Sequence, residues 1–259
     1  MPFQNAATMR KLFTDLKLPS SYFHIADGSS GVAHSHSTLT RSGQPESFEF
    51  VTHCLTKQGD LAIALSHRVA TGAVAVYWSL DDRIDSQALV TDMLSLQQYA
   101  FHPVFVPCLM LSEIRRMAVK RRQSIKERLS KLETALAALS CHQKQTEPES
   151  GDQEGVEFDR LFELLISCRR DQASREGRYD FWQSYYQGID NGLQYYEKVS
   201  AQEQGEANEL RRQAHTEIRH WAELTWQRFE SLRARDRDHV ARVEDASIMV
   251  FTRDMQKGD

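Results

Sequence analysis

The clearest hydrophobic pattern in this 259-residue chain begins at Pro107 and has the spacing of an α-helix. Apolar residues recur at helical steps as far as Ser140, at Leu111, Ile114, Ala118, Ile125, Leu129, Leu132, Leu136 and Leu139. This period places them on one helix face and predicts a helix over about 107–140. Pro107 suits the first turn, where a missing N–H costs nothing. With Pro103, it makes the segment 101–111 a hinge between two predicted parts of the chain.

The hundred residues before the hinge carry shorter patterns. Alternating or compact apolar runs predict strands at Phe48–Thr56, Leu61–Ser66 and Ala73–Trp78. Gly72 is placed for a hairpin turn before the last strand. Helical spacing predicts short helices at Thr8–Leu18 and Asp85–Tyr99, whereas the Ser-, Gly-, His- and Thr-rich stretch Gly28–Glu46 predicts a loop. We expect residues 1–100 to form a small strand-rich part of the α/β class, with α+β as the alternative.

Residues 101–259 are predicted to be helical apart from one polar break. That break is the acidic segment 143–155, which contains Pro148 and two glycines. A second helix follows over about 157–201, so that the two helices form a hairpin. The stretch 206–256 has neither proline nor glycine. It predicts one stalk-like helix roughly 75 Å long, at a rise of ~1.5 Å per residue.

The stalk-like helix carries an apolar stripe that is interrupted by Asp236 and His239. Its large members are Phe229, Leu232, Val243 and Val250. The first hundred residues offer too little to cover this stripe, and each such side chain left in water forgoes roughly 1.5–3 kcal/mol. We therefore expect self-association, weakened by the two polar residues. It should depend on pH as His239 gains charge near its reference pKa of about 6.5.

Composition narrows the classes of function. The chain is 41% hydrophobic and 26% charged, as in ordinary soluble proteins, and its net charge of −4 gives no general attraction to nucleic acid or anionic lipid. Its longest apolar run, 104–111, is broken by proline and is far shorter than the ~20 residues of a membrane helix. The N-terminus lacks the features of a secretory signal, and the four cysteines lie far apart. A cytoplasmic location is therefore the default expectation.

Three features of the chain together suggest a family. The segment His102-Pro103-Val104-Phe105-Val106-Pro107 precedes the first long helix, and a strand-rich start, a helical hairpin and one very long helix follow in that order. The tail then leads through Arg228, Leu232 and Arg235 into Ala246 and Thr252-Arg253-Asp254. In these features the chain resembles the cytoplasmic part of CorA-like magnesium transporters, particularly the divergent fungal members. Those proteins have a similar His-Pro-aliphatic-Pro segment and a Thr-basic-Asp segment before the first membrane helix.

The chain also departs from that family. Family members continue into two membrane helices, the first of which ends in Gly-Met-Asn, and this motif is absent from the sequence. Pore, selectivity filter and transport are therefore not carried over. We expect either the soluble cytoplasmic portion of a transporter, at the cytoplasmic face of a membrane, or a protein that keeps this domain without the channel.

The resemblance also implies ions and partners. In the family, acidic residues at protomer boundaries bind divalent ions that hold the closed assembly. On the stalk-like helix the positions to which this points for Mg²⁺ are Asp236, Asp245 and Asp254, although a solvated helix face explains them equally well. The resemblance further implies a homo-oligomer, a pentamer, that contacts a membrane only through segments absent from this chain. No nucleic-acid partner is expected.

Other candidate sites have simpler explanations. The spacing of His34 and His36 suits metal binding, but a solvated loop is favoured. The basic face between Arg115 and Lys131 suits phosphate or an acidic partner, yet a solvated or internally compensated face is favoured. Gly188-Ile189-Asp190-Asn191-Gly192 matches Gly-x-x-x-Gly and indicates close helix packing.

Aromatic residues gather in the second hairpin helix, at Tyr179, Phe181, Trp182, Tyr185, Tyr186, Tyr195 and Tyr196. They resemble a ligand cage, but at helical spacing half of them must be core. Trp182 and Ile189 share a face, and we expect both to be buried against the helix that begins near Pro107.

Motifs of catalysis are missing from the sequence. It contains no Gly-x-Ser-x-Gly, no phosphate-binding loop, no His-Glu-x-x-His and no dinucleotide glycine pattern. We therefore expect no enzyme activity and no cofactor beyond Mg²⁺ at subunit boundaries. The preferred function is the regulatory portion of a CorA-like metal-ion transporter. The alternative is a stand-alone interaction module that uses the hairpin and the long helix as a docking surface.

Overall fold

The computed structural model describes residues 6–28, 31–56, 59–80, 82, 84–142, 151–202 and 206–257. It confirms the predicted mixed α/β class: a sheet near the N-terminus is followed by long helices. Two compact units are present, unit 1 with Met1–Met117 and Asp180–Gln227, and unit 2 with Ala118–Tyr179 and Arg228–Asp259. The predicted boundary near residue 100 divides the strands and short helices from the three long helices. Each compact unit, in contrast, combines segments that lie far apart in the sequence.

The sheet of unit 1 is an antiparallel meander. Its strands are β1 (Val32–Leu39), β2 (Pro45–Thr56), β3 (Gly59–Arg68) and β4 (Ala73–Ser79), and they lie side by side in chain order. The three strands expected from the sequence are confirmed as β2, β3 and β4. The turn before β4 uses Gly72 at φ 61°, a backbone conformation that glycine adopts without strain.

The loop predicted at Gly28–Glu46 is wrong, because β1 lies within it. This strand pairs along its length with β2, with Ser35 opposite Phe50 and Ser37 opposite Phe48. It is an edge strand with polar side chains on both faces, so it lacks the apolar alternation from which a strand is predicted. Cross-strand bonds such as Thr38 Oγ1 to Ser47 Oγ, 2.7 Å, hold it instead.

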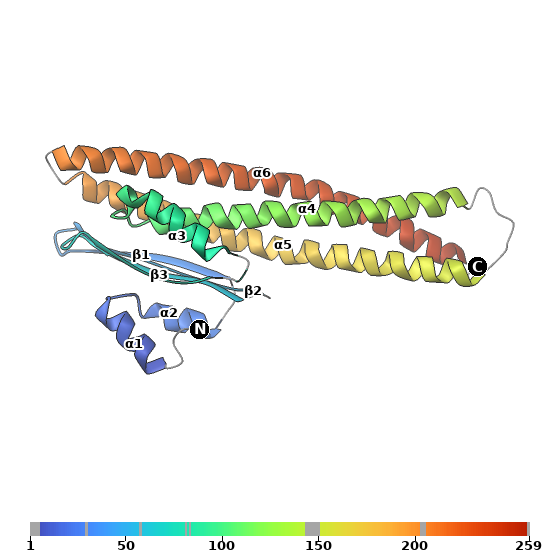
Figure 1. The fold of residues 1–259 in the computed structure, drawn as a ribbon, viewed down its shortest axis with the longest axis horizontal. Coiled ribbons are helices and arrows are strands. Elements are labelled where there is room, and N and C mark those ends of the chain that lie inside the picture. The colour runs from blue at the N-terminus through green and yellow to red at the C-terminus, as the bar shows by residue number, and fades with distance from the viewer. Residues whose placement is uncertain are drawn as a thin grey trace. The chain divides into compact units, whose positions relative to one another are not determined.

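Helices cover both faces of this sheet (Figure 1). The short helices α1 (Ala6–Asp15) and α2 (Ser21–Gly28) cover one face, where Phe13 and Tyr22 pack against Tyr77. The buried cluster on that side also includes Leu18, Val51, Ala62 and Ala64. The opposite face presents Phe48 and Phe50 to helix α5 (Gly151–Ser200). Unit 1 is therefore layered, with the sheet in the middle.

Two glycines let α5 approach the sheet closely. A Cβ atom on Gly188 would lie 2.2 Å from Cε2 of Phe50. A Cβ atom on Gly192 would lie 2.3 Å from Cγ1 of Val104 and 2.8 Å from Cζ of Phe48. The Gly-x-x-x-Gly pattern therefore does serve close packing, but against sheet aromatics as well as the segment before α4.

The segment between the sheet and the long helices contains a capped short helix and a 3₁₀ turn. Helix α3 (Ser86–Ser95) begins at Asp85, whose Oδ1 accepts the Ala88 N–H at 2.9 Å, and a 3₁₀ turn η1 (Gln97–Tyr99) follows it. Helix α4 (Phe105–His142) starts two residues before the predicted position. The Tyr185 hydroxyl of α5 donates to the Pro107 carbonyl at 3.1 Å, which ties α5 to the start of α4.

The burial expected for two residues of α5 is confirmed, whereas their packing against the helix that begins near Pro107 stays a prediction. Trp182 and Ile189 are both buried, and so are Phe181, Tyr185, Tyr195 and Tyr196. The predicted break over 143–155 is partly wrong, because α5 already begins at Gly151, and residues 143–150 lie outside the described part of the chain. A glycine within a helix costs only about 1 kcal/mol relative to alanine, so the glycines there do not prevent a helix.

The long C-terminal helix is confirmed as α6 (Glu206–Lys257), 52 residues long. The expectation that its apolar stripe is uncovered is wrong: Phe229, Val243 and Val250 are all at most 3% exposed. In unit 2, Val243, Ala246 and Val250 form one cluster with residues of α4 and α5, namely Leu129, Leu132, Leu136, Leu161, Leu165 and Cys168. The helical hairpin supplies the apolar surface that residues 1–100 lack.

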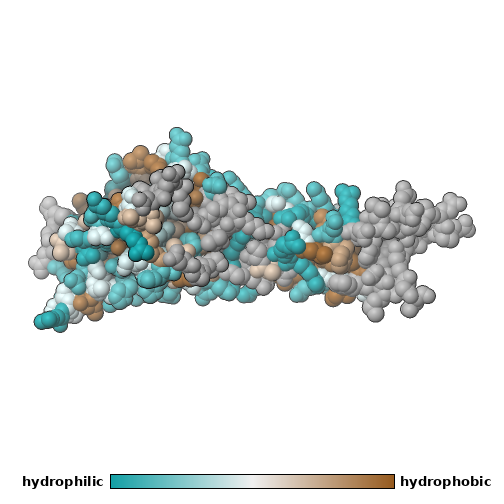
Figure 2. All heavy atoms as spheres, turned by 90° about the horizontal axis from the view of Figure 1, so that it is seen from below, coloured by the Kyte–Doolittle hydropathy of each residue, from teal (hydrophilic) through white to brown (hydrophobic). Residues whose placement is uncertain are grey.

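The surface is mainly hydrophilic on the face shown in Figure 2, with hydrophobic residues in small groups. The most exposed large hydrophobic side chains include Leu210, Leu94, Ile248, Leu39 and Met249. Within the described residues, no helix combines the length and apolar character that crossing a membrane requires.

We predict that Gly188→Ala and Gly192→Ala each destabilise the protein, although alanine favours helix. Overpacking a tight core costs typically 1–3 kcal/mol, which outweighs a propensity gain of about 1 kcal/mol. Urea unfolding followed by circular dichroism measures the change. Gln194→Ala, at an exposed position of the same helix, is the control and should stay within about 0.5 kcal/mol of wild type. Equal or greater stability of the glycine variants would contradict the close packing.

Candidate functional site

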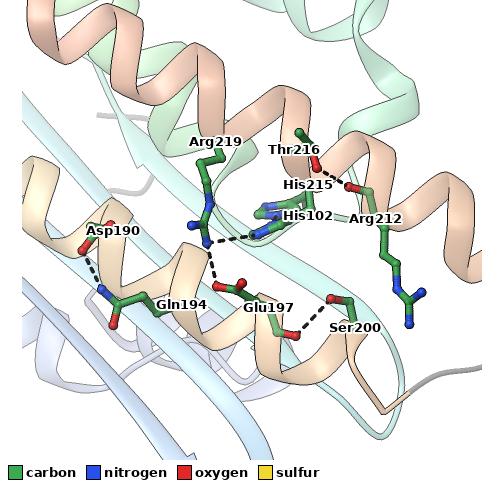
Figure 3. Close-up of polar contacts among 9 residues, drawn as sticks. All are labelled: His102, Asp190, Gln194, Glu197, Ser200, Arg212, His215, Thr216 and Arg219. Atoms are coloured by element: carbon green, nitrogen blue, oxygen red, sulfur yellow. Dashed lines mark hydrogen bonds and ion pairs between the residues drawn. The ribbon is translucent and has the colours of Figure 1, made fainter.

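A pair of buried histidines joins three elements of unit 1 (Figure 3). Nε2 of His102, in the segment before α4, lies 3.0 Å from Nδ1 of His215 in α6. The two side chains belong to residues only 1% and 8% exposed, and their rings are stacked. Tyr196 of α5 lies against both rings, with centroids 4.2 Å from His102 and 5.7 Å from His215. The pair therefore fixes α6 to α5 and to the start of α4.

Local backbone geometry places His102. Its carbonyl accepts the Phe105 N–H at 3.1 Å, and its ring Nδ1 lies 3.3 Å from the Val104 N–H. The side chain thus folds back over the first turn of α4, where N–H groups have no partner within the helix. Pro103, which has no N–H, fits between them without leaving a donor unpaired.

An ion pair lies at the outer side of this cluster. Nη2 of Arg219, one turn after His215 on α6, lies 2.8 Å from Oε2 of Glu197 on α5 and 3.4 Å from Nε2 of His215. Figure 3 shows the guanidinium between the carboxylate and the imidazole. These two charged side chains are 37% and 61% exposed, so the ion pair by itself contributes little to stability.

Three contacts follow one another, Val104 to His102, His102 to His215, and His215 to Arg219. The number of ring protons decides how many of them are hydrogen bonds. Val104 and Arg219 can only donate, and each neutral histidine carries one ring proton. If Val104 donates to His102, the proton of His102 points to His215, and that of His215 then faces Arg219. In three of the four combinations of neutral tautomers, two of the three contacts are hydrogen bonds. The fourth, with the protons on His102 Nδ1 and His215 Nε2, makes none. A third ring proton leaves only one.

Burial has the same effect on the pKa values. The pKa of His102 is held well below its ordinary value, first by burial and then by the nearby His215 and His67. The pKa of His215 is lowered by burial and by the Arg219 charge, against the opposing effect of Glu197. Both imidazoles are therefore neutral in the folded protein near neutral pH.

A second buried polar cluster joins the three long helices of unit 2. The Asp236 carboxylate of α6 accepts from Arg122 Nε of α4 at 3.2 Å and from the Tyr179 hydroxyl of α5 at 2.6 Å. The guanidinium of Arg233 lies 5.4 Å from the centre of the Tyr179 ring, within cation–π range. His239 Nδ1 lies 3.9 Å from Asp236 Oδ1. The polar interruption of the stripe is thus the point where all three helices meet.

Further polar contacts follow along α6 in the same unit. Arg242 binds Glu133 of α4 with two hydrogen bonds, 2.7 and 2.6 Å, in a fork arrangement. Arg169 of α5 donates to Ser247 at 3.2 Å. Polar contacts therefore alternate with the apolar cluster of Val243, Ala246 and Val250 along this part of α6.

The predicted metal positions have different surroundings. Both carboxylate oxygens of Asp236 have protein partners, Asp245 is exposed, and the side chain of Asp254 lies outside the described part. Among the residues whose placement is described, no three or more His, Cys, Asp or Glu side chains are grouped to hold a metal. The assignment of Mg²⁺ to these three residues stays a prediction.

The remaining sequence candidates are dispersed. His34 and His36 do share one face of a strand, but they are exposed and lie opposite Val51 and Glu49. Part of the basic face is internally compensated, since Arg116 pairs with Glu113 at 2.6 Å and Arg122 with Asp236. Sequence reasoning missed the histidine pair, because 113 residues separate His102 from His215.

Comparisons of the chain with protein-family models, with curated proteins and with solved structures found no match in any of the three.

We predict that acidification destabilises the protein through the histidine pair. Below pH ~6.5 both histidines are protonated in the unfolded chain but stay neutral in the folded protein. The free energy of unfolding therefore falls as pH falls, by up to about 1.4 kcal/mol per pH unit for each histidine. Urea unfolding from about pH 7.5 to about pH 5.5 measures this slope. His215→Asn should flatten it, whereas His220→Asn, at an exposed position of α6, should not. Equal slopes for the two variants would disprove the assignment.

We also predict that Asp236→Ala destabilises the protein by about 2 kcal/mol, because it leaves Arg122 and Tyr179 without their common acceptor. Asp238→Ala, at an exposed position two residues on, is the control and should have little effect. Denaturant unfolding of Asp236→Ala, Tyr179→Phe and the double variant gives their coupling. If the two single effects simply add, the contact carries no free energy of its own.

Proposed function

We propose that the chain is the regulatory, cytoplasmic portion of a CorA-like divalent metal-ion transporter. The element order supports this proposal, since a sheet with helices on both faces is followed by a hairpin, α4 and α5, and by the single long helix α6. That order is what the resemblance of the His102–Pro107 segment and of the tail implies. In this role α6 passes a conformational change along its length.

The observation that carries the proposal is how α6 is held. In each unit it is attached through a desolvated polar cluster, the pair of His215 with His102 in unit 1 and the contacts of Asp236 in unit 2. The unit 2 cluster contains a partly buried ion pair between Arg122 and Asp236. Such pairs come close to balancing desolvation against attraction, unlike an uninterrupted apolar seam. Such contacts can be exchanged for others at a small net free energy, so an ion can shift α6 between two arrangements.

The proposed ion acts on the exposed side of α6. Asp245 is exposed and lies next to Ala246, which belongs to the buried cluster of unit 2. A carboxylate there is open to a second copy of the chain, as a divalent ion at a subunit boundary requires. Hard cations such as Mg²⁺ prefer oxygen ligands and keep several waters, so one carboxylate from each copy is a suitable donor set.

The alternative function is a stand-alone interaction module. The observation in its favour is the exposure of neighbouring apolar residues on α6, Ile248 at 64% and Met249 at 54%. Exposed apolar side chains that lie together mark contact surfaces in soluble proteins. In this case association needs no divalent ion.

Sedimentation in the analytical ultracentrifuge, with and without millimolar magnesium at constant ionic strength, tests the proposal. We expect magnesium to raise the mass of the wild-type chain and Asp245→Asn to require more magnesium for the same mass. Glu244→Gln, the exposed neighbour, is the matched control and should follow wild type. The two candidate functions predict a different dependence on magnesium, so the same run separates them.

The interaction module would be favoured if association is the same with and without magnesium and in Asp245→Asn. In that case Ile248→Ser combined with Met249→Ser should abolish it. A mass that magnesium does not change, in a chain that stays monomeric throughout, would overturn the regulatory proposal.

A further inference from the structure

Strand β4 is the less protected edge of the sheet. It is the outermost strand on its side, and its seven residues, AVAVYWS, include no charge and no proline. The uncharged run is longer still, from Val69 to Leu80. Its side chains from Val74 to Ser79 are half-buried, so they are neither sealed in the core nor typical of a polar edge. Outer N–H and C=O groups of such an edge strand are a template for another strand.

The opposite edge has features that discourage pairing. Strand β1 carries His34, Ser35, His36 and Ser37, and its register with β2 shifts between Thr38 and Leu39. Polar side chains and irregularities of this kind are how natural sheets protect their edges. Strand β4 pairs with β3 without such a shift, from Arg68 opposite Ala73 to Ala62 opposite Ser79.

We propose that β4 pairs antiparallel with β4 of a second copy of this chain, which joins two sheets into one. A two-fold axis at Val76 places Val76 opposite its own copy, Val74 opposite Trp78, and Ala75 opposite Tyr77. The ends then pair Ala73 with Ser79. Val74 and Ala75 thus face the larger Trp78 and Tyr77, and no like charges meet, because the strand contains no charge. A self-complementary pattern of this kind is what a symmetric interface between identical copies requires.

The size of the contact sets its strength. Seven residues at ~3.3 Å each give a strand about 23 Å long. One strand pair buries less than the roughly 1,200–2,000 Å² of a stable protein interface, so the dimer should be weak and reversible. This inference does not depend on the proposed function, since it involves neither α6 nor a metal ion.

Charged substitutions at Val76 test the pairing, and a pair of opposite charges distinguishes lost pairing from a damaged fold. In sedimentation at about 100 µM without magnesium, a weak dimer is expected for wild type. Val76→Lys and Val76→Glu should each be monomeric, because two like charges would face each other. Mixing the two variants should restore the dimer, which a damaged fold cannot do. His36→Lys, at an exposed position of β1, is the control and should dimerise like wild type.

A cross-link gives a second measurement should the charged variants fold poorly. Residues directly opposite in antiparallel strands have Cα atoms about 4.5–5.5 Å apart, within the range that a disulfide spans. Val76→Cys should therefore form a disulfide-linked dimer under mild oxidation, and His36→Cys, at an exposed position of β1, should not. The proposal would be overturned if wild type is monomeric and Val76→Cys forms no cross-link. A dimer that persists unchanged in both charged variants would also overturn it.

Discussion

The close approach of α5 to the sheet is the contact on which unit 1 depends. Gly188 and Gly192 leave no room for a Cβ atom above Phe50 and Phe48, and any larger residue would push the helix outward. Because α5 lies so near, Tyr195 reaches His67 on β3 at 3.0 Å, and Tyr196 packs on His102. The position of the histidine pair therefore depends on two glycines, which have no side chain.

Buried polar groups, rather than apolar area alone, determine how α6 is attached. The two desolvated imidazoles of His102 and His215 are both neutral. The desolvated carboxylate of Asp236 needs the two donors that Arg122 and Tyr179 supply. Each arrangement is specific, since removing one partner leaves the other unsatisfied at a cost of about 1–3 kcal/mol. Specific contacts of this kind fit the role proposed above for α6, in which the helix shifts between two arrangements.

The stripe of α6 shows why burial is hard to predict from sequence. Its apolar spacing suggests that Phe229, Val243 and Val250 need a second copy of the chain, yet they are covered within one chain. Residues 1–100 are too few to cover them, but α4 and α5 have apolar faces of their own, and Leu132 and Leu165 complete the cluster. The covered stripe therefore no longer supports self-association. Any association must use other surfaces.

Local hydrophobic spacing was enough to predict most element types, because it depends only on backbone geometry: period 3.6 after Pro107, and shorter alternating runs that form β2, β3 and β4. It also indicated the tight packing at Gly188 and Gly192 and the buried face of Trp182. It missed β1, whose polar residues show no period, since its hydrogen bonds come from β2. The meetings of His102 with His215 and of Asp236 with Arg122 emerge only in the folded chain. Those pairs are 113 and 114 residues apart. No local pattern records which side chains folding will bring together across such distances.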